Sequence, residues 1–90
     1  NRLLVEESMR LAKENGAMIS FDPGCFQLVR EYKELITHLL KEYIDIFFAN
    51  EDEIKELFYL PPEEACKAMS KIVPVSVVLR GDKGCLVGSK

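Results

Sequence analysis

The chain of 90 residues is long enough for one small domain or for part of a larger one. Its hydrophobic fraction of 48% is that of a globular chain, and its net charge of −3 argues against a nucleic-acid partner, which would favour a basic surface stripe. No apolar run approaches the roughly 20 residues needed to cross a bilayer, and no signal-peptide pattern opens the chain. We therefore expect no nucleic acid and no membrane as partner.

The cysteines and the chain ends indicate the setting of the protein. The cysteines are odd in number, far apart and without CxxC spacing, which is typical of reduced thiols: Cys25, Cys66 and Cys85. The first residue is Asn rather than Met, and both ends look cut rather than finished. We expect a cytoplasmic protein, with an organelle as the alternative because a targeting segment would lie in the missing N-terminus.

The first half of the chain shows helical and strand patterns in turn. Residues 3–14 place apolar side chains on one side and charged side chains opposite, which predicts an amphipathic helix that stops at Asn15-Gly16. The apolar run 17–21 predicts a short strand, and the Asp-Pro-Gly sequence that follows it predicts a turn. Residues 26–43 have apolar side chains at i, i+3, i+4 and i+7 spacing, which predicts one long helix.

The second half continues the alternation. The run 44–49 predicts a buried strand and 51–58 a short helix. A longer helix begins at Pro61-Pro62, because proline fits the first helical turn, and stops before Pro74. The last elements predict a β-hairpin, with strands at 75–79 and 85–88 around the turn Gly81-Asp82-Lys83-Gly84.

This order predicts an α/β fold. Continuous apolar strands that alternate with helices indicate a mostly parallel sheet covered on both faces, to which the hairpin adds an antiparallel strand. Ligands of such sheets bind beyond the carboxyl ends of the strands. Three polar motifs follow predicted strands, namely DPGC at 22–25, NEDE at 50–53 and RGDKG at 80–84. If the strands are parallel, these motifs converge on one edge of the sheet.

Asn50 and Glu53 have two interpretations that do not exclude each other. Asn followed three residues later by Glu is the capping-box pattern, in which each side chain binds the backbone of the other residue. A helix N-terminus also favours anions, and a carboxylate there could hold Mg²⁺ through its waters while the metal neutralises phosphate. The pattern alone leaves both open.

The glycine turn is open in the same way. Gly81 and Gly84 suit the positive φ of a hairpin, but their bare amides also permit close approach of a phosphate, with Arg80 or Lys83 as the nearby cation. Asp22 lies in a turn and is a further candidate for lining a polar substrate pocket. His38 lies among charged residues and has no second ligand at metal-binding spacing, so we expect it to be solvated.

Taken together, four segments resemble the middle of a PfkB-family (ribokinase-like) carbohydrate or nucleoside kinase. NEDE matches the N-x-x-E motif of that family, and LRGDKG matches its T-x-G-x-x-G turn. The segments occur in the order of the family: LAKENGAMISFDPG, IDIFFANEDEIKEL, PPEEACKAM and VSVVLRGDKGCLV. The resemblance implies a three-layer α/β/α, Rossmann-like fold, in which residues 1–90 are an internal segment of a single kinase domain that is incomplete at both ends.

The resemblance implies an enzyme that uses ATP and Mg²⁺ to transfer the γ-phosphate to a hydroxyl of a small sugar or nucleoside. Asn50, Arg80, Gly81 and Gly84 match nucleotide-binding positions, and Glu53 matches the metal position, acting with Asn50 through water and phosphate. The chain holds no catalytic residue, because the base Asp of the family lies in a downstream Gly-Ala-Gly-Asp motif. The isolated chain is therefore expected to be inactive. A homodimer of the full-length parent is left open.

Two departures from the family pattern leave alternatives. Leu79 stands where the family has Thr, and Gly24 and Phe26 replace the Asn and Arg of a D-P-N-x-R motif, which argues against a fructose-like or keto-acid substrate. A second hypothesis is a segment of an inactive relative that serves as a regulatory or interaction protein. A third is an independent α/β binding module such as a receiver domain, although the acid cluster of receivers is not evident.

Overall fold

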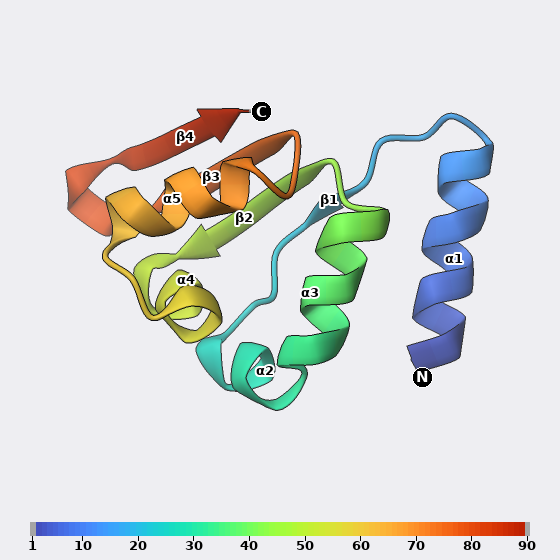
Figure 1. Cartoon of the computed structure of the whole chain (residues 1–90), viewed down its shortest axis with the longest axis horizontal. Helices are drawn as coiled ribbons and strands as arrows, with labels where there is room; N and C mark the ends of the chain where they lie inside the picture. Colours follow the sequence, from blue (N-terminus) through green and yellow to red (C-terminus); the bar gives the residue numbers. More distant parts are fainter. Residues whose placement is uncertain (1, 90) are drawn as a thin grey trace.

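The computed structural model describes residues 2–89, with side chains from residue 4 onward. A four-stranded sheet has the order β1-β2-β3-β4 (Figure 1). Its strands are Ser20–Phe21, Ile46–Asn50, Val75–Leu79 and Cys85–Ser89. The helices are α1 Arg2–Glu14, α2 Phe26–Glu31, α3 Lys33–Glu42, α4 Glu51–Phe58 and α5 Pro62–Ser70, and a 3-10 turn, η1, covers Gly81–Lys83. No helix in the described part of the chain has the length and apolar character to cross a bilayer.

The pairing of the strands confirms the predicted fold class. Strands β1, β2 and β3 are parallel, and β4 pairs antiparallel with β3. Ile46 of β2 pairs with Val75 of β3, and the same register brings Asn50 opposite Leu79 at the carboxyl end of both strands. Helices connect the parallel strands, so strands and helices alternate along the chain as the apolar patterns predict.

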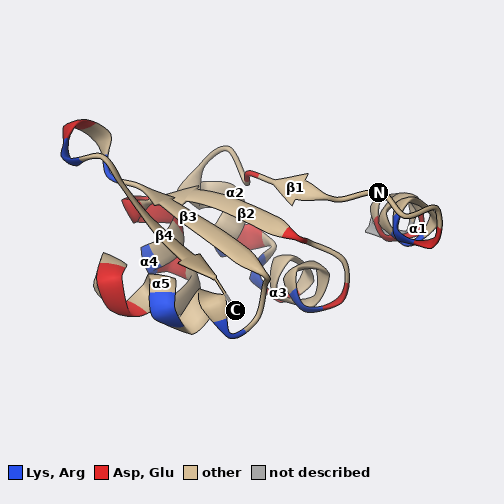
Figure 2. Cartoon of the chain, turned by 90° about the horizontal axis from the view of Figure 1, so that it is seen from above, with Lys and Arg blue, Asp and Glu red and all other residues tan. Residues whose placement is uncertain are grey.

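The helices α3, α4 and α5 lie on one face of the sheet (Figure 2). The strand side chains that point toward them are buried, including Phe47, Ala49 and Val78, whereas Phe48 and Val77 on the other face are only partly buried. This alternation is the period-two pattern of a strand with one covered face. Residues 2–89 thus supply one of the two helical layers that a three-layer α/β/α domain requires.

The predicted helix 26–43 is divided in the structure. α2 ends and α3 begins at Tyr32, whose φ of −115° and ψ of 31° are not helical. The two parts have different partners. Arg30 of α2 pairs with Glu56 of α4 at 2.7 Å, whereas α3 buries Ile36, Leu39 and Leu40 in the core. The bend at Tyr32 lets both contacts form, which a straight helix of this length would not allow.

α1 is a helix as predicted, but most of its apolar side stays exposed. Leu4 is 67% exposed and Leu11 49%, and Met9 alone packs against the core among the apolar residues of this side. α1 lies beside α3, beyond β1 (Figure 1). Polar contacts hold it there: His38 Nε2 lies 2.7 Å from Glu6 Oε2, and Lys13 Nζ lies 2.7 Å from Asp45 Oδ1.

His38 keeps 40% of its side chain exposed, in line with the expected solvation, but it also has a partner that the sequence did not indicate. Its ring lies against Tyr43 edge to face, with the ring centres 6.3 Å apart, in addition to the contact with Glu6. The sequence places Glu6 32 residues away, so spacing along α3 gave no sign of this contact. The three cysteines are free, as expected.

Candidate functional site

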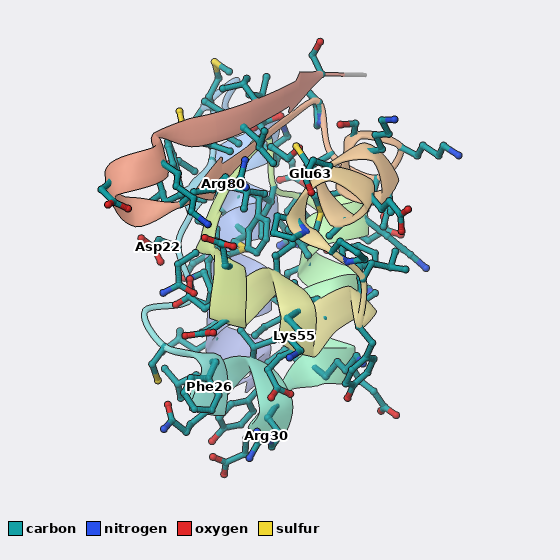
Figure 3. The ribbon with its side chains drawn as sticks, turned by 90° about the vertical axis from the view of Figure 1, so that its left-hand side faces the viewer. Asp22, Phe26, Arg30, Lys55, Glu63 and Arg80 are labelled. Atoms are coloured by element: carbon teal, nitrogen blue, oxygen red, sulfur yellow. The ribbon has the colours of Figure 1, made fainter. Side chains whose placement is uncertain are left out.

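The carboxyl ends of β1, β2 and β3 meet at one edge of the sheet because these strands are parallel. Asp22 follows β1, Asn50 ends β2 and Arg80 follows β3. Figure 3 looks onto this edge and shows Asp22 on one side of the sheet and Glu63 of α5 on the other, with Arg80 between them. The edge therefore gathers the three motifs that sequence reasoning singled out.

The β2–α4 junction is built by reciprocal hydrogen bonds between Asn50 and Glu53. Asn50 is the N-cap, in an extended conformation with φ −86° and ψ 178°. Its Oδ1 accepts from the Glu53 N–H at 2.8 Å, and Glu53 Oε1 accepts from the Asn50 N–H at 2.9 Å. The capping interpretation is thus present in the structure, and such a cap contributes about 1 kcal/mol to helix stability.

The first turn of α4 combines this cap with an acidic cluster. Glu51, Asp52 and Glu53 all lie at the positive end of the helix dipole, where carboxylates are stabilised. Glu53 is only 2% exposed, because it lies under the strand end, whereas Asp52 is exposed. The second carboxylate oxygen of Glu53, Oε2, makes no hydrogen bond within residues 2–89. One oxygen is therefore used in the cap and one is free for a further polar contact.

The turn between β3 and β4 extends beyond α4 and α5 (Figure 2). Both of its glycines have positive φ, 63° at Gly81 and 86° at Gly84. The turn closes through three backbone bonds: Arg80 N–H to the Gly84 carbonyl at 2.8 Å, Lys83 N–H to the Arg80 carbonyl at 3.2 Å, and Gly84 N–H to the Gly81 carbonyl at 3.2 Å. A Cβ on either glycine would have nothing within 4 Å. The surface of this turn is consequently bare backbone with open space around it.

Arg80 points away from Asn50. Ser76 and Val78, which lie on the same face of the strand as Arg80, are buried under the helices. Arg80 Nη2 lies 3.5 Å from Glu63 Oε1 at the start of α5 (Figure 3). Leu79, not Arg80, is the register partner of Asn50, and its side chain is 43% exposed on the other face of the sheet. The structure brings Asn50 and Glu53 together and places the glycine turn on the neighbouring strand, but it turns the guanidinium of Arg80 toward α5.

Two other side chains complete the edge. Asp22 Oδ1 accepts from the Gly24 N–H at 3.0 Å, so this carboxylate shapes its own turn and is exposed. Glu63 lies in the first turn of α5, where the sequence predicts only the start of a helix, yet it is the ion-pair partner of Arg80. Its separation from Arg80 along the chain carries no periodic signal, so sequence reasoning missed it.

The described side chains do not form a closed metal site. No group of three or more His, Cys, Asp or Glu side chains within residues 2–89 lies close enough together to hold a metal ion. Mg²⁺ does not need such a cage, because it keeps several waters and is bound through one or two carboxylates plus phosphates. Glu53, with its free Oε2, fits that limited role.

A surface hollow of about 800 Å³ lies elsewhere, between α1 and the α2–α3 junction. Val5, Arg30 and Tyr32 are among the residues that line it, and none of its lining residues belongs to a strand end. Its charged lining is mixed, with Arg30 and Lys33 beside Glu31 and Glu34, and it holds none of the three motifs. The strand ends and the α4 N-terminus, rather than this hollow, therefore define the candidate site.

The sheet is open and mainly parallel, with a helix N-terminus and a glycine turn at adjacent strand ends. This arrangement is typical of α/β proteins that bind ligands beyond the carboxyl edge of the sheet. The model of the pfkB family carbohydrate kinases matches residues 2–90 of the chain. The chain belongs to this family, which confirms the resemblance inferred from its motifs. No curated protein sequence matches the chain.

Solved structures share the fold. An adenosine kinase from Sinorhizobium meliloti superposes with a TM-score of 0.87 at 20% identity, over 96% of this chain and 27% of that one. A candidate ribokinase II from E. coli, in complex with ATP and Mg²⁺, gives a TM-score of 0.76 at 28% identity, over 94% and 29% of the two chains. A PfkB protein from Polaromonas sp. JS666 gives 0.75 at 21% identity, over 94% and 31%. The chain thus spans less than a third of each of these structures.

Proposed function

We propose that the full-length protein is a kinase that uses ATP and Mg²⁺ to phosphorylate a hydroxyl of a small sugar or nucleoside in the cytoplasm. Residues 1–90 form part of its one kinase domain. The observation that carries this proposal is the Asn50–Glu53 pair at the start of α4, one strand away from the bare glycine turn. Membership of a family of carbohydrate kinases supports the same reaction class.

The α4 start supplies the metal side of the site. Glu53 Oε1 is bound to the Asn50 N–H in the cap, and Oε2 would be the atom that holds Mg²⁺, through water. Because Glu53 is 2% exposed, a contact through water fits better than direct coordination of the ion. Bound Mg²⁺ would neutralise the phosphate charge that develops during transfer. Asn50 holds the carboxylate in place through the cap.

The glycine turn supplies the backbone side. Gly81 and Gly84 carry no side chain that would keep a phosphate away, and the space next to them is open. The Gly84 N–H already donates to the Gly81 carbonyl, so we propose that the Gly81 N–H is the amide of this pair that donates to a phosphate oxygen. Phosphoryl transfer also requires that the substrate hydroxyl and a catalytic base be positioned at the same time. The resemblance to the family implies that this base lies downstream of the chain. We therefore propose that the chain alone is inactive and that the rest of the parent completes the site.

The test uses the full-length protein and the variant Glu53→Gln. Calorimetric titration with ADP and Mg²⁺ should show binding by the wild type and a dependence of that binding on magnesium that the variant loses. Glu51→Gln removes the same charge from the same helical turn without touching the cap, so it serves as the matched control. Equal magnesium dependence in wild type and Glu53→Gln would disprove the metal role of Glu53.

A second candidate function has one observation in its favour. Arg80 is engaged by Glu63, and Leu79 offers no hydroxyl at the strand end. A relative with these features that had lost activity would act by binding a partner protein rather than by turnover. Nucleotide binding without phosphorylation of any of a panel of sugars and nucleosides would favour this alternative.

A further inference from the structure

The guanidinium of Arg80 is incompletely used in this fold. Its Nε is the only side-chain nitrogen or oxygen in the described part of the chain that is wholly shielded from solvent and has no hydrogen-bond partner, whereas the unpaired Oε2 of Glu53 keeps some exposure. Its Nη2 has a single ion-pair contact, with Glu63 Oε1 at 3.5 Å, which is long for a charge-assisted hydrogen bond. Nε and Nη2 together form the edge of a guanidinium that binds an oxyanion with two parallel bonds. That edge has no well-placed acceptor here.

The surroundings of Arg80 make its present position dependent on Glu63. The guanidinium lies at the N-terminus of α5, where the helix dipole is positive and disfavours a cation. The Glu63 carboxylate offsets this repulsion. A buried N–H without an acceptor adds a desolvation cost that an oxyanion would remove. Two unfavourable terms thus act on Arg80, and one half-exposed carboxylate opposes them.

The backbone of Arg80 forms part of the turn that we propose receives the phosphate. Its own N–H closes the glycine turn by donating to the Gly84 carbonyl at 2.8 Å. A side chain that leaves Glu63 by rotating about its own bonds therefore stays at the turn. Its side chain is 22% exposed, so part of it already faces solvent.

We propose that Glu63 is a positioning residue that holds Arg80 at α5 and competes with the nucleotide phosphates for its guanidinium. When a polyphosphate reaches the glycine turn, Arg80 exchanges the carboxylate for phosphate oxygens and becomes a binding residue. Glu63 thereby lowers the affinity of the site for polyphosphate anions. The proposal rests on the phosphate-binding function of the turn and adds a competing contact that regulates it.

The experiment uses the full-length protein and titrates inorganic tripolyphosphate, and separately ADP with Mg²⁺, by calorimetry. Glu63→Gln should tighten the binding of both by about two- to fivefold, the effect expected of a half-exposed ion pair. Glu63→Asp, which keeps the charge, should stay close to wild type. Arg80→Met should weaken binding, and in the double variant Glu63→Gln/Arg80→Met the gain from the Gln should disappear.

Glu64→Gln is the matched control, since it removes the same charge from the same helical turn at an exposed position. If Glu64→Gln tightens binding as much as Glu63→Gln, general electrostatics explain the effect and the proposal is wrong. Unchanged binding in Glu63→Gln, or in Arg80→Met, also overturns it. A wild type that binds neither probe contradicts the kinase function itself, whereas these variant results contradict only the role of Glu63.

Discussion

Asn50 and Glu53 each hold the backbone of the other, with Asn50 Oδ1 2.8 Å from Glu53 N and Glu53 Oε1 2.9 Å from Asn50 N. This pair ends β2 and starts α4 at the same edge of the sheet that the glycine turn occupies. A cap fixes its two side chains in one geometry, so it is also a way to hold a carboxylate still near a phosphate. Under the function proposed above, Asn50 and Glu53 have two separable roles: they stabilise the start of α4, and they hold a carboxylate for the metal.

Substitutions of Glu53 should separate these demands. In Glu53→Gln the side-chain oxygen can still accept from the Asn50 N–H, so the free energy of unfolding should stay within about 0.5 kcal/mol of wild type. Glu53→Ala loses the cap contact and should cost about 1 kcal/mol. Both variants should lose magnesium-dependent nucleotide binding. Urea denaturation of the full-length protein, followed by circular dichroism, gives the stabilities, and calorimetry gives the binding.

The glycine turn predicts a difference between its two glycines. Neither a Cβ at Gly81 nor one at Gly84 would meet a neighbour, so Ala substitution tests backbone conformation alone. Gly84 has φ 86° with ψ −140°, a region close to the one that only glycine adopts, whereas the φ of 63° at Gly81 is a value that the left-handed helical region also allows to other residues.

Gly84→Ala should therefore destabilise the protein by about 1–3 kcal/mol, and Gly81→Ala by about 1 kcal/mol. Thermal unfolding of both variants, with wild type as reference, measures the difference. Equal losses of stability would mean that the two glycines are not distinguished by their backbone angles. A loss of nucleotide binding in Gly81→Ala without a matching loss of stability would support a role of this turn at the phosphate.

Much of the fold was predictable because it follows from local patterns. The helix 51–58 and the strand 75–79 have the predicted bounds, since an N-cap, a glycine turn and period-two or helical spacing all lie within the element itself. The break at Tyr32 was not predictable. Apolar spacing continues through it, and the contact that α2 makes with α4, from Arg30 to Glu56, joins residues 26 positions apart.

The positions of the candidate residues in the fold were predictable to the same degree, whereas their roles stay predictions. Residue type and position after a strand are enough to indicate Asn50, Glu53 and the two glycines. They do not indicate the direction of Arg80, because strand alternation and the location of α5 decide on which side of the sheet its guanidinium lies. The exposed apolar side of α1 has a related cause, since amphipathic spacing shows which side could be buried but not what lies next to it.

The contacts of α1 predict a dependence on pH. The hydrogen bonds that Lys13 donates hold the pKa of Asp45 below its usual range, against the opposing effect of burial and with further help from the Ile19 N–H. A carboxyl whose pKa is lower in the folded state contributes stability above its unfolded pKa and loses it as pH falls through the folded value. The attachment of α1 should therefore weaken below about pH 4.

Hydrogen exchange of the α1 amides in the full-length protein measures this attachment. Protection should fall in the wild type as pH is lowered below about 4, after correction for the intrinsic exchange rate, and Lys13→Met should show reduced protection already at neutral pH. Lys41→Met, which removes a lysine from α3 with no ion-pair partner among the described residues, is the control. Protection in Lys13→Met equal to that of wild type at every pH would refute a role of the Lys13–Asp45 pair.

The packing of β4 on α5 gives the last prediction. A Cβ on Gly88 would collide with Ser70 Oγ and come within 3.1 Å of both Cys66 Sγ and Ser76 Oγ. The Ser70 hydroxyl donates to the Cys66 carbonyl at 2.7 Å, so it can move only by losing that bond. Gly88→Ala should therefore destabilise the protein by about 1–3 kcal/mol, the usual cost of overpacking.

A second substitution identifies the cause. Ser70→Ala removes the hydroxyl that the new methyl group would meet, and in the double variant Gly88→Ala/Ser70→Ala a large part of the loss should be recovered, beyond the sum of the single effects. Additive losses in this cycle, measured by urea denaturation, would mean that Ser70 is not what excludes a side chain at Gly88. Recovery would instead show that β4 lies against α5 without a side chain between them, because Ser70 on the helix fills the space beside Gly88.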